Sequence, residues 1–128
     1  MPRLLLLLTG GTLMMSPELR TENGPTSQDL VREIPSLARV AELETRLLFS
    51  MDSADMQPSD WLTLAREVHA ELPKYDGIVV VHGTDTMAYT ASALGLLLGP
   101  LPKPVILTGS QRPLVEARSD ARQNLVDA

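Results

Sequence analysis

The chain has 128 residues, enough for one domain or part of a larger one, and 44% of them are hydrophobic, which excludes a chain that is disordered throughout. It contains no cysteine, and this excludes disulfides, a thiolate nucleophile and a Cys-ligated zinc site. The net charge is −5 and only 3% of the residues are aromatic, so the composition argues against binding of a phosphate backbone or stacking on bases. We therefore expect no nucleic-acid partner for this chain, while one held by another domain stays open.

The first apolar segment is a run of five leucines at residues 4–8, which is far too short to cross a bilayer. Gly10 and Gly11 follow it closely, and no clean signal-peptide cleavage site comes after them. We therefore interpret residues 3–8 as a buried strand of a parallel sheet. This interpretation predicts a cytoplasmic protein with no membrane partner.

The next elements alternate between loop, helix and strand. Residues 16–27 are polar and rich in Pro, Gly, Glu and Thr, which predicts a long loop. Ser27 is expected to cap a short helix that runs to Ile34, because Pro35 limits it. Residues 41–49 place apolar side chains at every second position, and this pattern predicts a half-buried strand.

The middle of the chain contains two clear helices. Ser59 is expected to cap the first helix, which Pro73 ends, and its apolar face is Trp61, Leu64, Ala65, Val68 and Leu72. Residues 87–98 form the second, strongly apolar helix, which ends at Gly99. Residues 78–81, all β-branched, and residues 104–107 are predicted to be strands.

Ser119 is predicted to open a last helix, whose pattern continues to Ala128 without a Gly, a Pro or a polar ending. We therefore expect the chain, residues 1–128, to be the N-terminal fragment of a longer protein. The alternation of strands and helices predicts the α/β class: a three-layer, Rossmann-like parallel sheet with helices on both faces, incomplete at its C-terminal end.

Four of the predicted strands lead into short polar turns rich in glycine and hydroxyl groups, at residues 9–12, 52–55, 82–86 and 108–111. In a parallel sheet these turns share one edge, where ligands bind. Hydroxyls and backbone N–H groups there can hold a carboxylate, and Asp85 can hold a cation such as an ammonium group. Neither of the phosphate-binding patterns GxGxxG and GxxxxGK[ST] is present, so the sequence predicts no nucleotide cofactor, and without cysteine it predicts no Cys-ligated metal.

Taken together, these turns resemble the signatures of the bacterial-type L-asparaginases. The sequence LTGGTL at residues 8–13 resembles the first signature of that family, and HGTDTM at 82–87 closely matches the second. The segments DSADM at 52–56, LTGSQRP at 107–113 and SDARQNL at 119–125 are similar to further family segments, in the same order. The resemblance covers nearly the whole chain and implies the N-terminal domain of an asparaginase.

The resemblance implies an amidohydrolase that converts L-asparagine, and in some members L-glutamine, to the acid and ammonia without a cofactor. Thr12 would be the nucleophile that forms an acyl-enzyme, and Thr84 and Asp85 would belong to a proton relay with a lysine. Backbone N–H groups of Thr12 and Thr84 would stabilise the oxyanion. The implied substrate-binding residues are Gly11, Ser53, Ala54, Gly83, Thr84, Asp85 and Ser110, with Ser53 on the α-carboxylate and Asp85 on the α-ammonium.

Three departures from the family pattern affect the expected activity. The relay lysine is missing, because the two lysines, Lys74 and Lys103, both precede the segment after which the family places it. No tyrosine lies between Thr12 and Pro25, where many members carry one, and Ala54 replaces a side-chain amide. The family's C-terminal domain, which completes the site of a neighbouring subunit, is also absent. We therefore expect a homo-oligomeric amidohydrolase at full length and little or no activity from these 128 residues alone.

Two other functions stay open. One is the asparaginase-like subunit of a tRNA-dependent amidotransferase, which the acidic composition and the early position of Thr12 argue against. The other is a non-catalytic α/β module that binds amino acids. His82 is interpreted as structural rather than as part of a Ser-His-Asp triad, and His69 as a surface residue.

Overall fold

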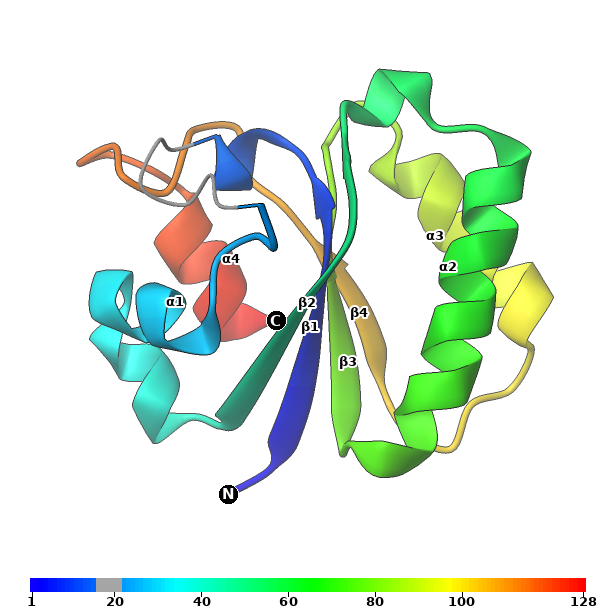
Figure 1. Ribbon diagram of the computed structural model, residues 1–128, viewed down its shortest axis with the longest axis horizontal. Helices are drawn as coiled ribbons and strands as arrows, with labels where there is room; N and C mark the ends of the chain where they lie inside the picture. Colours follow the sequence, from blue (N-terminus) through cyan, green and yellow to red (C-terminus); the bar gives the residue numbers. More distant parts are fainter. Residues whose placement is uncertain (16–21) are drawn as a thin grey trace.

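The computed structural model describes residues 1–15 and 22–128. Its four strands form one sheet in which all neighbours run parallel, in the order β2-β1-β3-β4. The strands are β1 (Arg3–Gly10), β2 (Glu42–Met51), β3 (Gly77–Val81) and β4 (Val105–Thr108) (Figure 1). The α/β class and the parallel sheet predicted from the sequence are confirmed.

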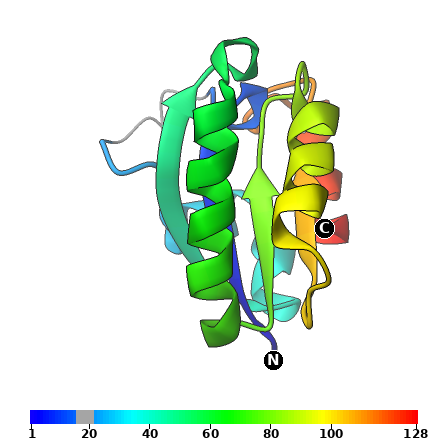
Figure 2. The ribbon, with the colours of Figure 1, turned by 90° about the vertical axis from the view of Figure 1, so that its right-hand side faces the viewer.

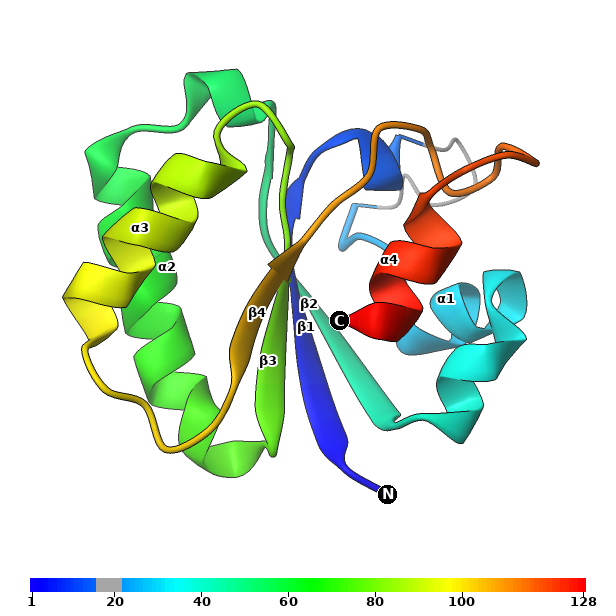
Figure 3. The ribbon, with the colours of Figure 1, turned by 180° about the vertical axis from the view of Figure 1, so that it is seen from behind.

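In the described part of the chain, two α-helices cover each face of the sheet (Figures 1 and 3). On one face lie α1 (Ser27–Glu33) and α4 (Ala121–Asp127), and on the other lie α2 (Pro58–Glu71) and α3 (Met87–Leu98). Figure 2 shows α2 and α3 side by side in front of the sheet. Short 3₁₀ turns complete the fold: η1 (Thr12–Met14), η3 (Pro35–Arg39), η4 (Ser53–Asp55) and η5 (Leu72–Lys74).

The leucine run forms the central strand because both of its faces are covered. Leu5 and Leu7 belong to the hydrophobic cluster that includes Leu64 and Val68 of α2. Leu6 and Leu8 belong to the cluster on the opposite face, which includes Leu30 of α1 and Leu125 of α4. Burial on both faces explains why the segment reads as a continuous apolar run rather than as an alternating pattern.

The predicted starts of three helices are wrong by one or two residues. Thr26, not Ser27, is the N-cap of α1: its side chain accepts from Asp29 N, and the Asp29 carboxylate accepts from Thr26 N. Ser59 does not cap α2, because Pro58 already occupies the first turn and Gln57 is the N-cap. The last helix begins at Ala121 with Asp120 as its N-cap, although the Ser119 hydroxyl accepts from Ala121 N.

The other predicted elements lie close to their expected positions. The bounds of α3 are confirmed, and Gly99 follows it with a φ of 63°. Strands β1 and β2 each continue two residues beyond their predicted ends, to Gly10 and Met51. Half of the long loop predicted over residues 16–27 falls on 16–21, which lie outside the described residues, and its predicted last residue, Ser27, belongs to α1. Among the described helices, none is both long and apolar enough to span a membrane.

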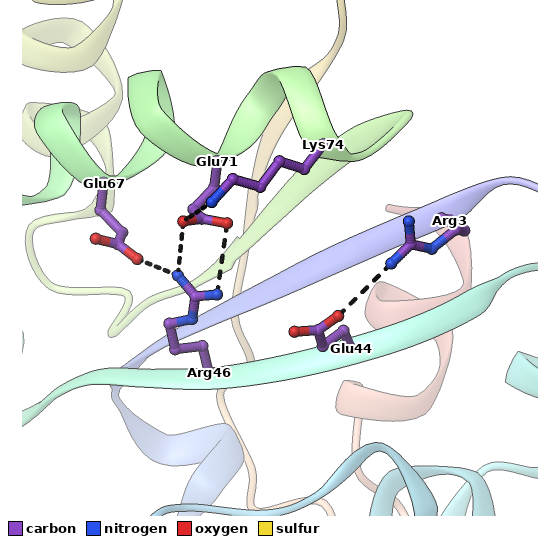
Figure 4. A network of polar contacts seen from close by, with 6 residues as sticks. All are labelled: Arg3, Glu44, Arg46, Glu67, Glu71 and Lys74. Carbon is purple, nitrogen blue, oxygen red and sulfur yellow. Dashed lines mark hydrogen bonds and ion pairs between the residues drawn. The ribbon is translucent and has the colours of Figure 1, made fainter.

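A network of charged side chains fastens β2 to α2 (Figure 4). The Arg46 guanidinium on β2 forms ion pairs with the carboxylates of Glu67 and Glu71 on α2. Lys74 Nζ also pairs with Glu71, at 2.8 Å from its Oε1. Glu71 is buried, with 7% of its surface exposed. Hydrogen bonds from Lys74 and then Arg46 lower the pKa of the Glu71 carboxyl below its ordinary value of 4.5.

Because folding lowers its pKa, the Glu71 carboxylate stabilises the fold above about pH 4.5, and the contribution is lost as the pH falls through the folded pKa. We expect Glu71→Gln to lower the free energy of unfolding by about 1–2 kcal/mol at pH 7, since Arg46 is partly exposed and solvent screens the pair. The loss should be smaller at pH 4 and is measured by urea unfolding at both values. Glu42→Gln, at an exposed position, is the control, and an equal loss at both pH values would contradict the assignment.

Candidate active site

The turns that follow the four strands all lie at one edge of the sheet, the upper edge in Figure 1, as predicted. Strand order reverses at β1, because β2 pairs with one side of it and β3 with the other. Open parallel sheets bind ligands outside the carboxyl ends of the strands at such a reversal. The turns after β1 and β3 are therefore the centre of the candidate site.

Two glycines bring three of these turns into contact. Gly11, after β1, has a φ of +91°, and a Cβ built on it would lie 2.7 Å from the Cα and N of Gly83. Gly83, after β3, lies against η4, and a Cβ built on it would lie 2.7 Å from Ser53 Oγ. A side chain at either position would separate the turns. Thr12, Thr84 and Ser53 are thus gathered at one place by direct backbone packing.

Three hydroxyl groups in this cluster have no hydrogen-bond partner within the described residues: those of Thr12, Ser53 and Thr84. Thr12 and Thr84 are partly exposed, so water can serve them, but Ser53 is only 3% exposed. Buried hydroxyls in folded proteins nearly always have a partner. An unpartnered Ser53 is therefore a group that a ligand would satisfy.

Two neighbouring hydroxyls at the same edge, those of Thr9 and Thr86, are engaged with the protein, which distinguishes them from the first three. Thr9 Oγ1 donates to the Val81 carbonyl at 2.7 Å, and Thr86 Oγ1 donates to the Ser53 carbonyl at 2.8 Å. These bonds join the end of β1 to the end of β3 and the turn after β3 to η4. They hold the cluster together, and sequence reasoning did not assign either residue.

The remaining predicted site residues lie around this centre. Asp85 is exposed, and its carboxylate makes no hydrogen bond or ion pair within the described residues. Ala54 is exposed in η4, where its N–H donates to the Asp52 carboxylate at 2.9 Å. Ser110 is 2% exposed, and its hydroxyl donates to the Arg112 carbonyl at 2.6 Å, so only its backbone is left to meet a ligand.

The turn after β4 is fixed by the first turn of α4. The Asp120 carboxylate accepts from the N–H groups of Gln111 and Arg112, and the first of these bonds is the main reason that its pKa is lowered. Asn124 Nδ2 donates to the Gly109 carbonyl at 2.8 Å. Both residues lie in the 119–125 segment that the sequence analysis singled out, but their roles could not be read from it.

His82 has a structural position, as expected. It is 1% exposed, its Nδ1 lies 2.6 Å from the Gly83 carbonyl, and its Nε2 lies 2.8 Å from Thr90 Oγ1. Burial lowers the pKa of the imidazole. Trp61, which was expected in the core, is half-buried, and its Nε1–H donates to Thr90 Oγ1. Both nitrogens of His82 therefore contact groups inside the fold, while His69 is exposed.

A cavity lies beside this cluster rather than inside it. Its volume is about 510 Å³, and it extends from Gly11 along the end of β2. Its lining residues are Gly10, Gly11, Met14, Met15, Glu22, Gly24, Leu47, Ser50, Met51 and Asp52. The cavity is not lined by Thr12, Ser53, Thr84 or Asp85. It adjoins the hydroxyl cluster at Gly11, which lines the cavity and also contacts Gly83.

The described turns contain no lysine or tyrosine. Lys103 donates to the carbonyls of Leu72, Pro73 and Tyr75, and Lys74 pairs with Glu71 at the end of α2, so both lysines lie near the opposite edge of the sheet. Tyr75 is buried there, and Tyr89 is exposed on α3. No group of three or more potential metal-ligating side chains is found among the described residues.

Comparison with known proteins gives a consistent result. A family model described as "Asparaginase, N-terminal" matches residues 3–128. L-asparaginase 1 of Escherichia coli (strain K12) is 46% identical over 128 residues, covering 94% of this chain and 37% of that protein. A glutamyl-tRNA(Gln) amidotransferase subunit of Pyrococcus horikoshii is 40% identical over 132 residues, covering 98% of this chain and 30% of that protein.

Among solved structures, the crystal structure of L-asparaginase I from Vibrio cholerae superposes with a TM-score of 0.86 at 40% sequence identity. The match covers 98% of this chain and 38% of that one, and the chain spans 30–38% of the length of these three relatives. Fold, motifs and sequence identity agree, and the chain belongs to the asparaginase family, whose N-terminal domain it matches.

Proposed function

We propose that the cluster of turns is the part of an L-asparaginase active site that binds the amino acid and supplies the nucleophile. The observation that carries the proposal is that three turns bring together Thr12, Ser53 and Thr84, whose hydroxyls have no hydrogen-bond partner within the described residues, and that Ser53 is also buried. The substrate would be L-asparagine, hydrolysed to L-aspartate and ammonia. The protein would be cytoplasmic and homo-oligomeric at full length, as the resemblance implies.

Recognition of the α-amino acid would use two groups: Ser53, which lies against Gly83, and Asp85, two residues after Gly83. The buried Ser53 hydroxyl would donate to the α-carboxylate, which replaces the partner it lacks in the free protein. The exposed Asp85 carboxylate would accept from the α-ammonium in a charge-assisted hydrogen bond. Gly11, Ala54, Gly83 and the backbone of Ser110 would line the space between them.

The chemical step would start from Thr12, which begins the η1 turn directly after the positive φ of Gly11. Its hydroxyl oxygen would attack the side-chain amide carbon, a base would take the hydroxyl proton and pass it to the amide nitrogen, and the C–N bond would break to release ammonia. Water would then hydrolyse the threonine ester to L-aspartate and restore Thr12. Backbone N–H groups of Thr12 and Thr84 would stabilise the oxyanion formed in each half.

The described turns supply Thr84 and Asp85 for proton transfer but no lysine to act as the base. We therefore propose that binding is retained by this chain and that turnover is slow. General acid–base catalysis contributes about 10²–10⁴-fold to enzymatic rates, which sets the size of the expected deficit.

The second candidate function is the asparaginase-like subunit of a tRNA-dependent amidotransferase, favoured by the 40% identity to the amidotransferase subunit of Pyrococcus horikoshii. The same cluster would then release ammonia for use on a charged tRNA. Ammonia release that depends on a charged tRNA and a partner subunit would favour this function over a free-standing asparaginase.

The first prediction concerns turnover. We expect the chain to release ammonia from L-asparagine at least about 100-fold more slowly than E. coli L-asparaginase 1 measured in parallel, because the cluster lacks the relay lysine. The residual release should disappear in Thr12→Ala. Release that survives in Thr12→Ala would show that Thr12 is not the nucleophile, and release as fast as that of the relative would show that the missing lysine is dispensable.

The second prediction concerns binding of the product L-aspartate, measured by calorimetry so that turnover is not required. Ser53→Ala should raise the dissociation constant about 10- to 100-fold, because a hydrogen bond to a charged group contributes about 1.5–3 kcal/mol. Ser92→Ala is the matched control, since the Ser92 hydroxyl donates within α3 to the Ala88 carbonyl and is exposed. Equal affinities of the Ser53→Ala and Ser92→Ala variants would remove Ser53 from the site.

A further inference from the structure

The two turns that would hold the ends of the amino acid come from strands that are not neighbours. Ser53 follows β2 and Thr84 follows β3, and β1 lies between these strands. The register of β2 on β1 shifts after Leu8, so that Met51 comes to lie opposite Gly10. A Cβ built on Gly10 would overlap the Met51 backbone, so β2 crosses closely over the end of β1. The sheet ladder alone therefore does not fix η4 against the turn after β3.

One side-chain hydrogen bond joins the two turns directly. Thr86 Oγ1 donates to the Ser53 carbonyl at 2.8 Å, and that carbonyl also accepts from Met56 N within η4. The other polar contacts between the two turns in the described structure involve the Met56 sulfur, 3.3 Å from His82 Nε2 and from Thr90 Oγ1. Thioether sulfur is a weak acceptor, so the Thr86 bond is the stronger link.

The position of Thr86 makes this use of its hydroxyl unusual. Thr86 is the N-cap of α3, where a threonine side chain ordinarily accepts a hydrogen bond from the second or third N–H of its own helix. Here the side chain makes no such bond and reaches to Ser53 instead. Capping of α3 therefore does not explain a threonine at this position, whereas a link between the turns does.

We propose that Thr86 is a positioning residue that sets the separation between Ser53 and the Thr84–Asp85 turn, and thereby the selectivity of the site for α-amino acids. The inference rests on the proposed function, in which Ser53 holds the carboxylate and Asp85 the ammonium. Thr86 itself would contact neither group. A ligand that needs both groups depends on the separation that Thr86 maintains, whereas a ligand without an ammonium group depends on Ser53 alone.

The test compares Thr86→Val, which keeps the shape but lacks the hydroxyl, with Thr86→Ser, which keeps it. Calorimetry measures the binding of L-aspartate and of succinate, which has no ammonium group. Thr86→Val should weaken L-aspartate binding about five-fold, the effect of one neutral hydrogen bond, and should leave succinate binding within about two-fold. Thr86→Ser should restore the wild-type affinity. Thr63→Val, which removes a hydroxyl that donates to Ser59 within α2, is the matched control.

Amide hydrogen exchange provides a second measurement that needs no ligand. The Met56 N–H, which bonds the Ser53 carbonyl, should exchange about five-fold faster in Thr86→Val and at the wild-type rate in Thr86→Ser. Unchanged exchange in Thr86→Val would show that Thr86 does not hold η4. Equal losses for L-aspartate and succinate, or no rescue by serine, would show that it does not set selectivity. If the wild-type chain binds no L-aspartate, the proposed function fails, and the exchange rates still decide whether the link exists.

Discussion

The direct packing of Gly11 on Gly83 is the contact on which the arrangement of the site depends. Adjacent parallel strands are about 4.8 Å apart, and side chains in their terminal turns would usually hold those turns further from each other. Because neither position has a Cβ, the backbone after β1 contacts the backbone after β3. Ser53, which follows β2 on the other side of β1, also contacts Gly83. Three turns that are distant in the sequence thus share one small volume.

The hydroxyl groups around this contact have two different roles. Thr9 and Thr86 use their hydroxyls to join turns, so their positions are fixed by the protein itself. Thr12 and Thr84, each directly after a contacting glycine, are left without such bonds in the described structure. The same short motifs therefore contain both kinds of residue. Some hold the turns together, and others keep a hydroxyl available for a ligand.

Much of the fold follows from the sequence because its main signals are strong. The leucine run of β1 and the apolar helix between Thr86 and Gly99 have clear patterns and clear ends. Helix starts were less predictable, because Thr26 and Ser27 are both good caps and only the partner Asp29 decides between them. At the site, parallel topology predicts that the turns share an edge. The Thr86–Ser53 bond could not be predicted, since it needs the strand order and the crossing of β2 over Gly10.

The two edges of the sheet carry different kinds of polar side chain. Both lysines and Arg46 lie at α2 or near the amino ends of the strands. There Arg46 and Lys74 pair with glutamates of α2, and Lys103 donates to backbone carbonyls. At the carboxyl edge the described turns offer hydroxyls and carboxylates such as Asp85 but no lysine. In the proposed function, the described residues would bind the amino acid and attack its amide, whereas the lysine of the proton relay would have to come from outside this cluster. Binding and turnover can therefore be tested separately in this chain, as the two predictions on ammonia release and L-aspartate binding do.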